Sequence, residues 1–399
     1  MKALLINEVC GVTSTGRICT DIAGILEASG WECKIAYGRK TVPAQYEKYA
    51  VRIGNKWGVY LHALGSRLLD NTGFYSYFAT KKLIRWVEKY DPDVIHLHNL
   101  HGYYIHLGVL FDYLHRCGKP IIWTLHDCWS FTGHCSHYDY VGCDKWKTGC
   151  HDCPMTREYP TSLWRDRSKR NYADKKRLFT GIDRLSLITP SHWLKRQVEQ
   201  SFLREYPVQA IYNGIDTDIF KPTAGAFRRE NGLEDKIMLL GVANVWSQRK
   251  GLNDFFRLAS ELDERYQLVL VGDLRGAECP ESVMHISHTN NPQELAEIYS
   301  AADVFLNLSY EEAQGMTTFE ALACGTPVVV YNKTSIPECV DDSCGEVIDD
   351  YDIDAIRDAI EKAVNKRQED CVKRASHYRK NDCFARNIAM YDKPFENED

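Results

Sequence analysis

Two glutamates on either side of a glycine have the types and spacing to bind hydroxyl groups beside a phosphate. They lie in LSYEEAQGMTTFEALACGTPVVVY, residues 308–331, which holds Glu312, Gly315 and Glu320. A loop entering a helix N-terminus offers free N–H groups and the positive end of the dipole to a phosphate. Carboxylates repel phosphate but accept hydrogen bonds from hydroxyls. The pattern predicts a nucleotide sugar as ligand, and an ordinary loop with two solvated glutamates is the alternative.

Parallel-sheet elements must position these residues. Asp303–Asn307 is a predicted strand, Met316–Cys324 a helix and Val328–Tyr331 a buried strand. Similar alternation of strands and helices runs through both halves of the chain, which predicts α/β domains with right-handed crossovers. Ligands of such sheets bind outside the carboxyl ends of the strands.

Two cationic residues directly precede the segment that leads into another predicted helix. Arg249 and Lys250 precede Phe255–Leu262, where they could reach a diphosphate that lies across strand ends. A solvated surface pair is the alternative.

The stretch EEAQGMTTFEALACGTPVV resembles the donor-site signature of the retaining glycosyltransferases of family 4, E-G-F-G-L-x-x-x-E-A-x-A-C-G-x-P-V-V. The resemblance implies the GT-B fold, in which two Rossmann-like domains with parallel sheets face a central cleft. Ala313 and Gln314 depart from it, because Gly-Phe is usual there. This departure puts the path of the loop in question.

The resemblance also implies roles for individual residues. Glu312 would hold sugar hydroxyls and orient the reacting carbon, and His126, at a strand end similar to the family's T-x-H-D, would line the sugar site. Glu320 would bind the ribose. The complete set of implied donor-binding residues is Gly16, Arg17, Arg249, Lys250, Thr289, Gly315, Met316, Thr317 and Glu320.

Domain boundaries follow from a linker motif. NGIDTDIFKP, residues 213–222, is similar to the N-G-I-D…F-x-P linker of the family. We therefore expect an N-terminal acceptor-side domain over residues 1–220 and a nucleotide-sugar domain over 221–375. Residues 376–399 would form a helix that returns to the first domain.

A cysteine-rich insertion is predicted at about residues 128–153. Cys135, Cys143, Cys150 and Cys153 have the spacing C-x7-C-x6-C-x2-C. A C-x2-C pair is a common half of a tetrahedral zinc site, and metal explains such a cluster better than disulfides in a reducing compartment. We expect a structural zinc here, with unligated thiols as the alternative.

Composition limits the class of protein. With 399 residues and a net charge of −6 the chain is long enough for two domains, and its charge argues against nucleic acid as a partner. No apolar run reaches the length of a membrane span, and MKALLINE is too short and too acidic for a signal peptide. These features predict a cytoplasmic protein.

A basic stretch, WRDRSKRNYADKKR, covers residues 164–177. A solvated helix face is the plain interpretation. Contact with an anionic membrane, at its inner face, or with a lipid-diphosphate acceptor is the alternative.

Together these observations predict a retaining hexosyltransferase of the kind found in capsular, exopolysaccharide or lipopolysaccharide biosynthesis. Its donor would be a UDP or GDP sugar and its acceptor a glycan or lipid-linked glycan. No cofactor is expected to be required for catalysis. A nucleotide-sugar epimerase or hydrolase, or a non-catalytic glycan- or partner-binding protein with a zinc module, remains as alternative.

Overall fold

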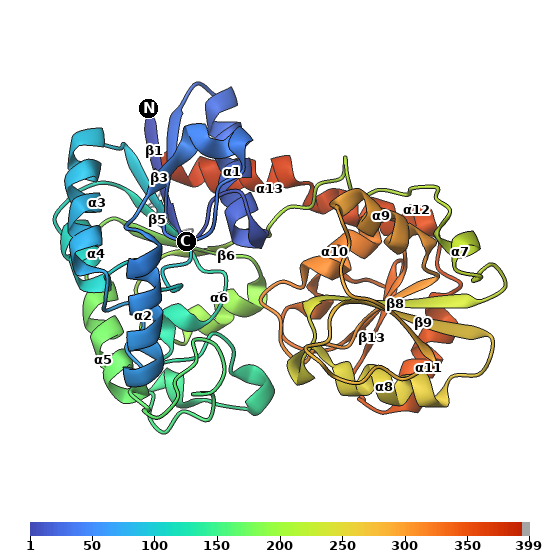
Figure 1. Ribbon diagram of the computed structural model, residues 1–399. Coiled ribbons are helices and arrows are strands. Elements are labelled where there is room, and N and C mark those ends of the chain that lie inside the picture. Colours follow the sequence, from blue (N-terminus) through green and yellow to red (C-terminus); the bar gives the residue numbers. More distant parts are fainter. Residues whose placement is uncertain (393–399) are drawn as a thin grey trace. The chain divides into compact units, whose positions relative to one another are not determined.

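The computed structural model describes residues 1–392, which divide into two compact units (Figure 1). Met1–Ile211 and, of the described residues, 384–392 form the first unit, and Tyr212–Cys383 the second. The predicted boundaries were placed near residues 220 and 376, whereas the contacts divide the chain after Ile211 and after Cys383. The last residues of the predicted returning helix, 393–399, lie outside the described residues.

The first unit is built on a seven-stranded parallel sheet in the order β3-β2-β1-β4-β5-β6-β7. Runs such as VIHL and IIWT are buried at every position, as expected for parallel strands covered on both faces. The strands are β1 (Lys2–Asn7), β2 (Glu32–Tyr37), β3 (Ala50–Arg52), β4 (Val94–Leu97), β5 (Ile121–Thr124), β6 (Leu185–Thr189) and β7 (Val208–Ala210).

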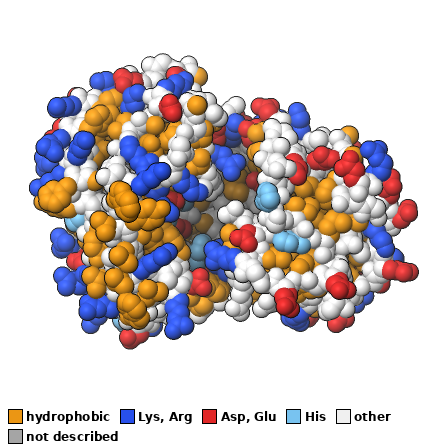
Figure 2. Space-filling view, in the orientation of Figure 1, with side chains coloured by type: hydrophobic (Ala, Val, Ile, Leu, Met, Phe, Trp, Pro, Cys, Tyr) orange, Lys and Arg blue, Asp and Glu red, His pale blue; other side chains and the backbone are white. Residues whose placement is uncertain are grey.

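The helices of the first unit connect these strands. They are α1 (Thr13–Ala28), α2 (Lys56–Leu69), α3 (Tyr77–Tyr90), α4 (Leu107–Leu114), α5 (Ser168–Phe179), α6 (His192–Glu199) and α13 (Lys380–Asp392), which starts in the second unit. Gly16 and Arg17, which the family resemblance implies as donor-binding residues, lie within the first turns of helix α1. Helix α2 was not predicted. Hydrophobic side chains lie among Lys and Arg on the face of this unit in view (Figure 2).

The second unit is a six-stranded parallel sheet in the order β10-β9-β8-β11-β12-β13. Its strands are β8 (Ile237–Val245), β9 (Tyr266–Asp273), β10 (Val283–Ile286), β11 (Val304–Asn307), β12 (Val328–Tyr331) and β13 (Gly345–Ile348). Its helices are α7 (Phe227–Glu230), α8 (Leu252–Glu261), α9 (Pro292–Ala301), α10 (Met316–Ala323), α11 (Ile353–Ala363) and α12 (Gln368–Ala375).

Two hydrophobic cores cover the two faces of this second sheet. Side chains of α9, α10 and α12 pack against one face, through residues such as Tyr299 and Phe319. Side chains of α8 and α11 pack against the other, through Phe255 and Ile356. The predicted fold class, an α/β chain with two parallel, Rossmann-like sheets, is confirmed.

Candidate functional site

The strand order of the second sheet reverses between β8 and β11. Strand β8 continues to β9 on one side, whereas β11 continues to β12 on the other. Because all of these strands are parallel, the loops after β8 and β11 leave the same edge at this switch point, where α/β sheets bind ligands. The predicted residues Arg249, Lys250, Glu312 and Gly315 all lie in these two loops.

Gly251 allows the two loops to touch. Its φ is +75°, and a Cβ at this position would lie 2.1 Å from the carbonyl oxygen of Leu308. Two hydrogen bonds then join the loops: the Tyr310 amide donates to the Arg249 carbonyl (2.8 Å), and the Arg249 guanidinium donates to the Glu311 carbonyl (2.6 Å). Arg249 is thereby held at the switch point by the loop that follows β11.

Lys250 and Glu312 form an ion pair across these loops. The backbone of Glu312 is fixed on both sides, because its amide donates to Thr334 Oγ1 (3.0 Å) and its carbonyl accepts from Ser335 Oγ (2.8 Å). Burial lowers the pKa of Lys250, and the charge of Glu312 opposes that shift. The structure therefore brings together the predicted diphosphate-binding cation and the predicted sugar-binding carboxylate, each neutralising the other.

Helix α10 begins at this edge. Gly315 precedes it with φ +72°, and no side chain among the described residues caps its N-terminus. Met316 and Thr317, in its first turn, are half-buried. The Asn307 side chain, at the end of β11, donates to Thr318 Oγ1 (2.9 Å) and fixes this turn against the strand. A helix start of this kind could bind an anion, and the predicted contacts of Gly315, Met316 and Thr317 with the donor stay predictions.

Glu320 and Thr289 lie farther along the same unit. Glu320 Oε2 accepts a hydrogen bond from the Tyr299 hydroxyl (2.9 Å), which joins α10 to α9. Thr289 lies in the loop between β10 and α9, and β10 is separated from β8 by β9. Their predicted contacts with the nucleoside stay predictions.

Gln314 is one of the two residues at which this loop departs from the family pattern. Its side chain is buried, and it forms two hydrogen bonds with the backbone of Asn213: the Asn213 amide donates to Oε1 (2.9 Å) and Nε2 donates to the Asn213 carbonyl (2.8 Å). The loop at the switch point is thus tied to the segment where the chain enters the second unit. Sequence reasoning missed this contact.

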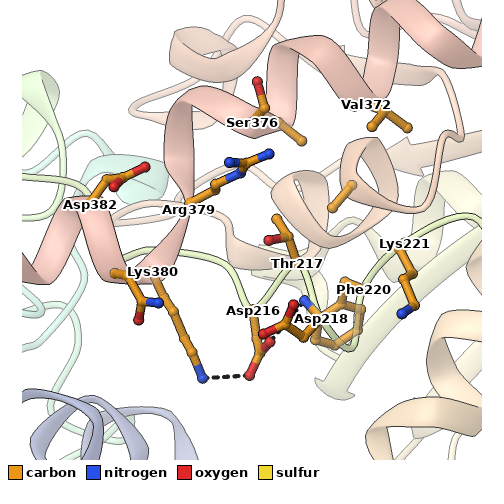
Figure 3. Close-up of a pocket in the computed structure, with 13 residues that line it drawn as sticks. Asp216, Thr217, Asp218, Phe220, Lys221, Val372, Ser376, Arg379, Lys380 and Asp382 are labelled. Atoms are coloured by element: carbon orange, nitrogen blue, oxygen red, sulfur yellow. Dashed lines mark hydrogen bonds and ion pairs between the residues drawn. The ribbon is translucent and has the colours of Figure 1, made fainter. Parts of the chain in front are cut away.

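A cavity of about 510 Å³ lies elsewhere in the second unit (Figure 3). Residues after Asn213 and residues of α12 and α13 line it, and Lys380 pairs with Asp216 there (2.6 Å). None of the predicted site residues lines this cavity.

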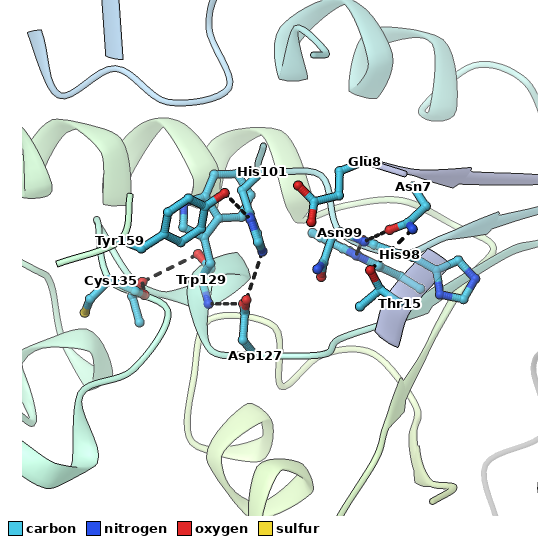
Figure 4. Close-up of polar contacts among 12 residues, drawn as sticks. Asn7, Glu8, Thr15, His98, Asn99, His101, Asp127, Trp129, Cys135 and Tyr159 are labelled. Carbon is cyan, nitrogen blue, oxygen red and sulfur yellow. Dashed lines mark hydrogen bonds and ion pairs between the residues drawn. The ribbon is translucent and has the colours of Figure 1, made fainter. Parts of the chain in front are cut away.

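In the first unit the switch point lies between β1 and β4, and histidines cluster after β4 and β5 (Figure 4). His98 Nδ1 lies 3.0 Å from His126 Nε2, and the two rings stack. Burial lowers the pKa of His126 to about 4, so this imidazole is neutral near pH 7. The predicted role of His126 in lining a sugar site stays a prediction.

Asp127 and Tyr159 complete this cluster, and neither was among the predicted site residues. His101 lies between them, with Nε2 2.9 Å from Asp127 Oδ2 and Nδ1 3.0 Å from the Tyr159 hydroxyl. The charge and hydrogen bond of Asp127 raise the pKa of His101 against the effect of burial. Asp127 directly follows His126, so its position just after β5 could have indicated a site residue. No pattern in the sequence singles out Tyr159.

The contacts of Gly16 and Arg17 are with residues outside that histidine cluster. The Gly16 carbonyl accepts from the Gly11 amide (3.0 Å), and a Cβ at Gly16 would lie 3.0 Å from Val9. Gly16 thus lets α1 pack closely on the loop after β1. Arg17 is exposed, and its Nε donates to the Thr13 carbonyl (3.4 Å).

The cysteine-rich loop brings thiols together. Cys150 Sγ accepts from the Gly133 amide (3.1 Å), Cys153 Sγ accepts from the Met155 amide (3.4 Å), and Cys135 hydrogen-bonds to Cys153. Among residues 1–392, however, no three His, Cys, Asp or Glu side chains are arranged to hold a metal ion. The predicted zinc set, which also includes Cys143, stays a prediction.

His134 lies inside the same loop. Its Nδ1 is 2.6 Å from Asp70 Oδ1, and its Nε2 is buried without a hydrogen-bond partner in the described part of the chain.

Within residues 1–392 no helix is both long enough and apolar enough to span a bilayer.

Comparison with known proteins identifies the family. Residues 15–219 match the family model described as Glycosyltransferase Family 4, and residues 225–381 match the model described as Glycosyl transferases group 1. These two matches divide the chain near the boundary between the two units.

Relatives and solved structures agree with these models. The chain is 27% identical over 274 residues to the colanic acid biosynthesis glycosyl transferase WcaC of Escherichia coli, covering 66% of this chain and 65% of that protein. It is 27% identical to N-acetyl-alpha-D-glucosaminyl L-malate synthase of Bacillus anthracis, over 40% of this chain and 45% of that protein. The chain thus spans just under two thirds of the first relative and under half of the second.

Two solved structures share the fold over nearly the whole chain. Sucrose-phosphate synthase of Thermosynechococcus elongatus superposes with a TM-score of 0.71 at 17% identity, covering 99% of both chains. HepE of Anabaena superposes with a TM-score of 0.66 at 16% identity, covering 99% of this chain and 100% of that one. The chain therefore belongs to glycosyltransferase family 4 and has the GT-B fold.

Proposed function

We propose that this glycosyltransferase is a retaining hexosyltransferase whose donor is a nucleoside diphosphate sugar, with UDP or GDP as the nucleotide. Its acceptor would be a hydroxyl of a glycan or lipid-linked glycan. The observation that carries the proposal is the meeting of Arg249, Lys250, Glu312 and the uncapped start of α10 at one switch point.

The cations would stabilise the departing diphosphate. As the glycosidic bond breaks, negative charge grows on the phosphate oxygens, and Lys250, Arg249 and the amides of residues 315–317 would lie around them. Gly251 keeps this part of the site narrow, because no side chain fits between it and the Leu308 carbonyl. No metal is needed for this charge balance, since two cations and a helix terminus supply it.

Glu312 would change partners when the donor binds. In the free protein it neutralises Lys250. A diphosphate would compete for Lys250, because it carries more charge than one carboxylate. The released carboxylate would then accept hydrogen bonds from sugar hydroxyls and fix the reacting carbon, the role that the family resemblance implies.

Similar proteins support the donor and the setting. HepE of Anabaena was solved with UDP and glucose and with UDP-glucose, and WcaC is described as acting in colanic acid biosynthesis. We therefore favour a role in the assembly of a surface polysaccharide.

Calorimetry with UDP, GDP and ADP, without added metal, tests the donor. We expect one nucleotide to bind, and its sugars to raise the melting temperature of the protein by mass action. Transfer to an oligosaccharide acceptor, followed by NMR of the product, should then show the anomeric configuration of the donor retained. Donor consumption without acceptor would instead indicate an epimerase or hydrolase, and binding without any turnover a binding protein.

A further inference from the structure

Helix α2 turns its apolar side outward. Trp57, Tyr60, Leu61 and Leu64 are 77%, 68%, 67% and 53% exposed. Their spacing of i, i+3, i+4 and i+7 places them on one face of the helix. His62 and Ser66, by contrast, are only 1% exposed. A surface helix of a water-soluble domain has the opposite arrangement.

Neighbouring segments extend this apolar face. Leu163 and Trp164 are 53% and 78% exposed, and the Leu163 amide donates to the Arg67 carbonyl at the end of α2 (2.8 Å). Tyr77 and Phe78, at the start of α3, are 41% and 84% exposed.

These eight side chains form what we call the α2 surface: Trp57, Tyr60, Leu61, Leu64, Tyr77, Phe78, Leu163 and Trp164. Such large side chains together expose on the order of several hundred Å², the size that marks an interaction site.

The exposed charges of residues 50–87, which carry six of the eight side chains of the α2 surface, have one sign, whereas near Trp164 the exposed Arg165 lies beside the exposed Asp166. From residue 50 to residue 87 the sequence contains a single carboxylate, Asp70. That carboxylate is 1% exposed and accepts from the Arg167 amide (2.7 Å), besides its contact with His134. The exposed charged residues of this segment are Arg52, Lys56, Arg67, Lys81, Lys82 and Arg85. The chain as a whole carries −6, so this concentration of positive charge is local.

Apolar side chains bordered by cationic side chains complement a surface that is both apolar and negatively charged. We propose that the α2 surface docks on an anionic lipid bilayer. Helix α2 lies along the membrane plane, with Leu61 and Leu64 at the acyl boundary and Trp57 and Tyr60 at headgroup level. Lysines and arginines at the border contact lipid phosphates. Figure 2 shows hydrophobic side chains next to Lys and Arg on this unit.

A second copy of the chain fits this surface less well. In a two-fold dimer the same patch meets itself, so Lys81 and Lys82 would face like charges. The basic stretch at residues 164–177, predicted for membrane contact, also fits less well than α2. Lys175 is buried there and donates to the Trp129 carbonyl (2.6 Å), and Asp174 lies within 3.9 Å of Arg177. Trp164 is the one residue of that stretch that belongs to the α2 surface.

Vesicle sedimentation of the full chain tests the proposal. We expect binding to vesicles of phosphatidylcholine mixed with phosphatidylglycerol, little binding to phosphatidylcholine alone, and weakening by salt. The double variant Trp57→Ser/Leu61→Ser should lower the partition coefficient roughly tenfold or more. Val347→Ser, at a 40% exposed position in the second unit, is the matched control and should bind as the wild type does.

Charge is tested separately. Lys81→Ala/Lys82→Ala should weaken binding to the anionic vesicles about tenfold while leaving the far-ultraviolet spectrum and the melting temperature unchanged. If the apolar double variant proves unfolded, the single variant Leu61→Ser replaces it.

Three results would overturn the proposal. The wild type does not bind anionic vesicles; or the α2 variants bind as well as the wild type; or light scattering finds a wild-type dimer that Trp57→Ser/Leu61→Ser dissociates, with no lipid binding. The last result would assign the surface to a second copy. None of these results depends on transferase activity, so the proposal stands apart from the proposed function.

Discussion

At the scale of single residues, Lys250 and Glu312 matter most. Their opposite charges form an ion pair in the free protein. A stable ion pair of this kind is usually structural, yet this one lies beside an uncapped helix N-terminus at a sheet switch point. Under the function we propose, the site needs a cation for phosphate and an anion for hydroxyls, and the ion pair keeps both charges neutralised until a ligand separates them.

This pairing predicts a split between binding and turnover. Glu312→Gln removes the competitor for Lys250, so UDP or GDP should bind at least as tightly as to the wild type, while turnover falls at least about a hundredfold. Lys250→Ala should instead weaken nucleotide binding. Calorimetry and initial rates measure both effects, and Glu361→Gln, at an exposed position on α11, is the control. Unchanged turnover in Glu312→Gln would exclude the role we assign to this carboxylate.

Buried histidines make stability depend on pH. Burial lowers the pKa of His96 to about 3 and of His126 to about 4. When the pKa of a histidine is lower in the folded chain than its value of about 6.5 in the unfolded chain, the unfolded chain binds more protons than the folded chain at any pH between these two pKa values. The contribution of each histidine to the free energy of unfolding is therefore fully present above about pH 6.5. It falls as the pH drops towards 4, by up to about 1.4 kcal/mol per pH unit for each group. His101, with its raised pKa, acts in the opposite sense.

The variant His96→Gln tests this dependence. His96 bridges Thr124 Oγ1 (2.8 Å) and the Tyr391 hydroxyl (2.7 Å), so the variant should be less stable at neutral pH. Its stability should nevertheless fall less steeply between about pH 6.5 and 4, because one titrating group is gone. Urea unfolding at several pH values measures the slope, with His377→Gln, at an exposed position, as the control. An unchanged slope in His96→Gln would contradict the prediction.

At the scale of elements, the sequence was most informative where pattern and burial agree. Strand β12 has the predicted bounds, Val328–Tyr331, because a β-branched run between turns is buried on both faces. Helix α2 was missed, because its sequence, KWGVYLHALGSRLL, contains two glycines and a histidine and turns its large apolar residues outward. The contact of Gln314 with Asn213 could not be predicted either, since it joins residues far apart in the sequence.

Gly251 provides an element-scale test of the switch point. Gly251→Ala would drive a Cβ into the Leu308 carbonyl, so the loops after β8 and β11 must separate. We expect a lower melting temperature and at least about a tenfold loss of nucleotide affinity.

Gly232→Ala is the matched control. Gly232 has a similar φ of +65°, but within residues 1–392 no neighbouring atom lies within 4 Å of an added Cβ. That variant should lose only about 1 kcal/mol from backbone strain and keep its nucleotide affinity. Equal effects of the two substitutions would show that the close approach of the loops is unimportant.

The cysteine-rich loop is the second element-scale test. Protein purified without chelator should contain about one zinc per chain, because four thiolates at this spacing can close a tetrahedral site. Removal of the metal should lower the melting temperature, and Cys150→Ser/Cys153→Ser should lower the zinc content. Cys279→Ser, outside the loop, is the control. Full alkylation of all four thiols in the native, metal-free protein would support the unligated alternative.

At the scale of the whole molecule, the chain passes between the two units twice, at residues 211–212 and again at 383–384. The sequence predicted the two sheets and the family, because the strand and helix patterns and the donor-loop signature are local. The family resemblance also implies that a helix near the end of the chain returns to the first domain, but the sequence did not predict its partners, because these lie in β1 and β2, far from α13 along the chain. Phe384, Met390 and Tyr391 are buried in the core that includes Leu5 and Ile35.

Truncation after Cys383 should therefore damage one unit and spare the other. The first unit would lose Phe384 and Tyr391 from its core together with the hydrogen bond from Tyr391 to His96, a loss of several kcal/mol by comparison with single aromatic deletions of about 3–5 kcal/mol. The two loops that we propose bind the nucleotide belong entirely to the second unit. In calorimetry, the unfolding transition that does not respond to UDP or GDP should move to lower temperature, whereas the responsive one stays. Arg386→Ala, on the exposed side of α13, should change neither transition. Loss of nucleotide binding in the truncated chain would mean that the second unit also depends on these residues, contrary to the division of the molecule into two separately packed cores.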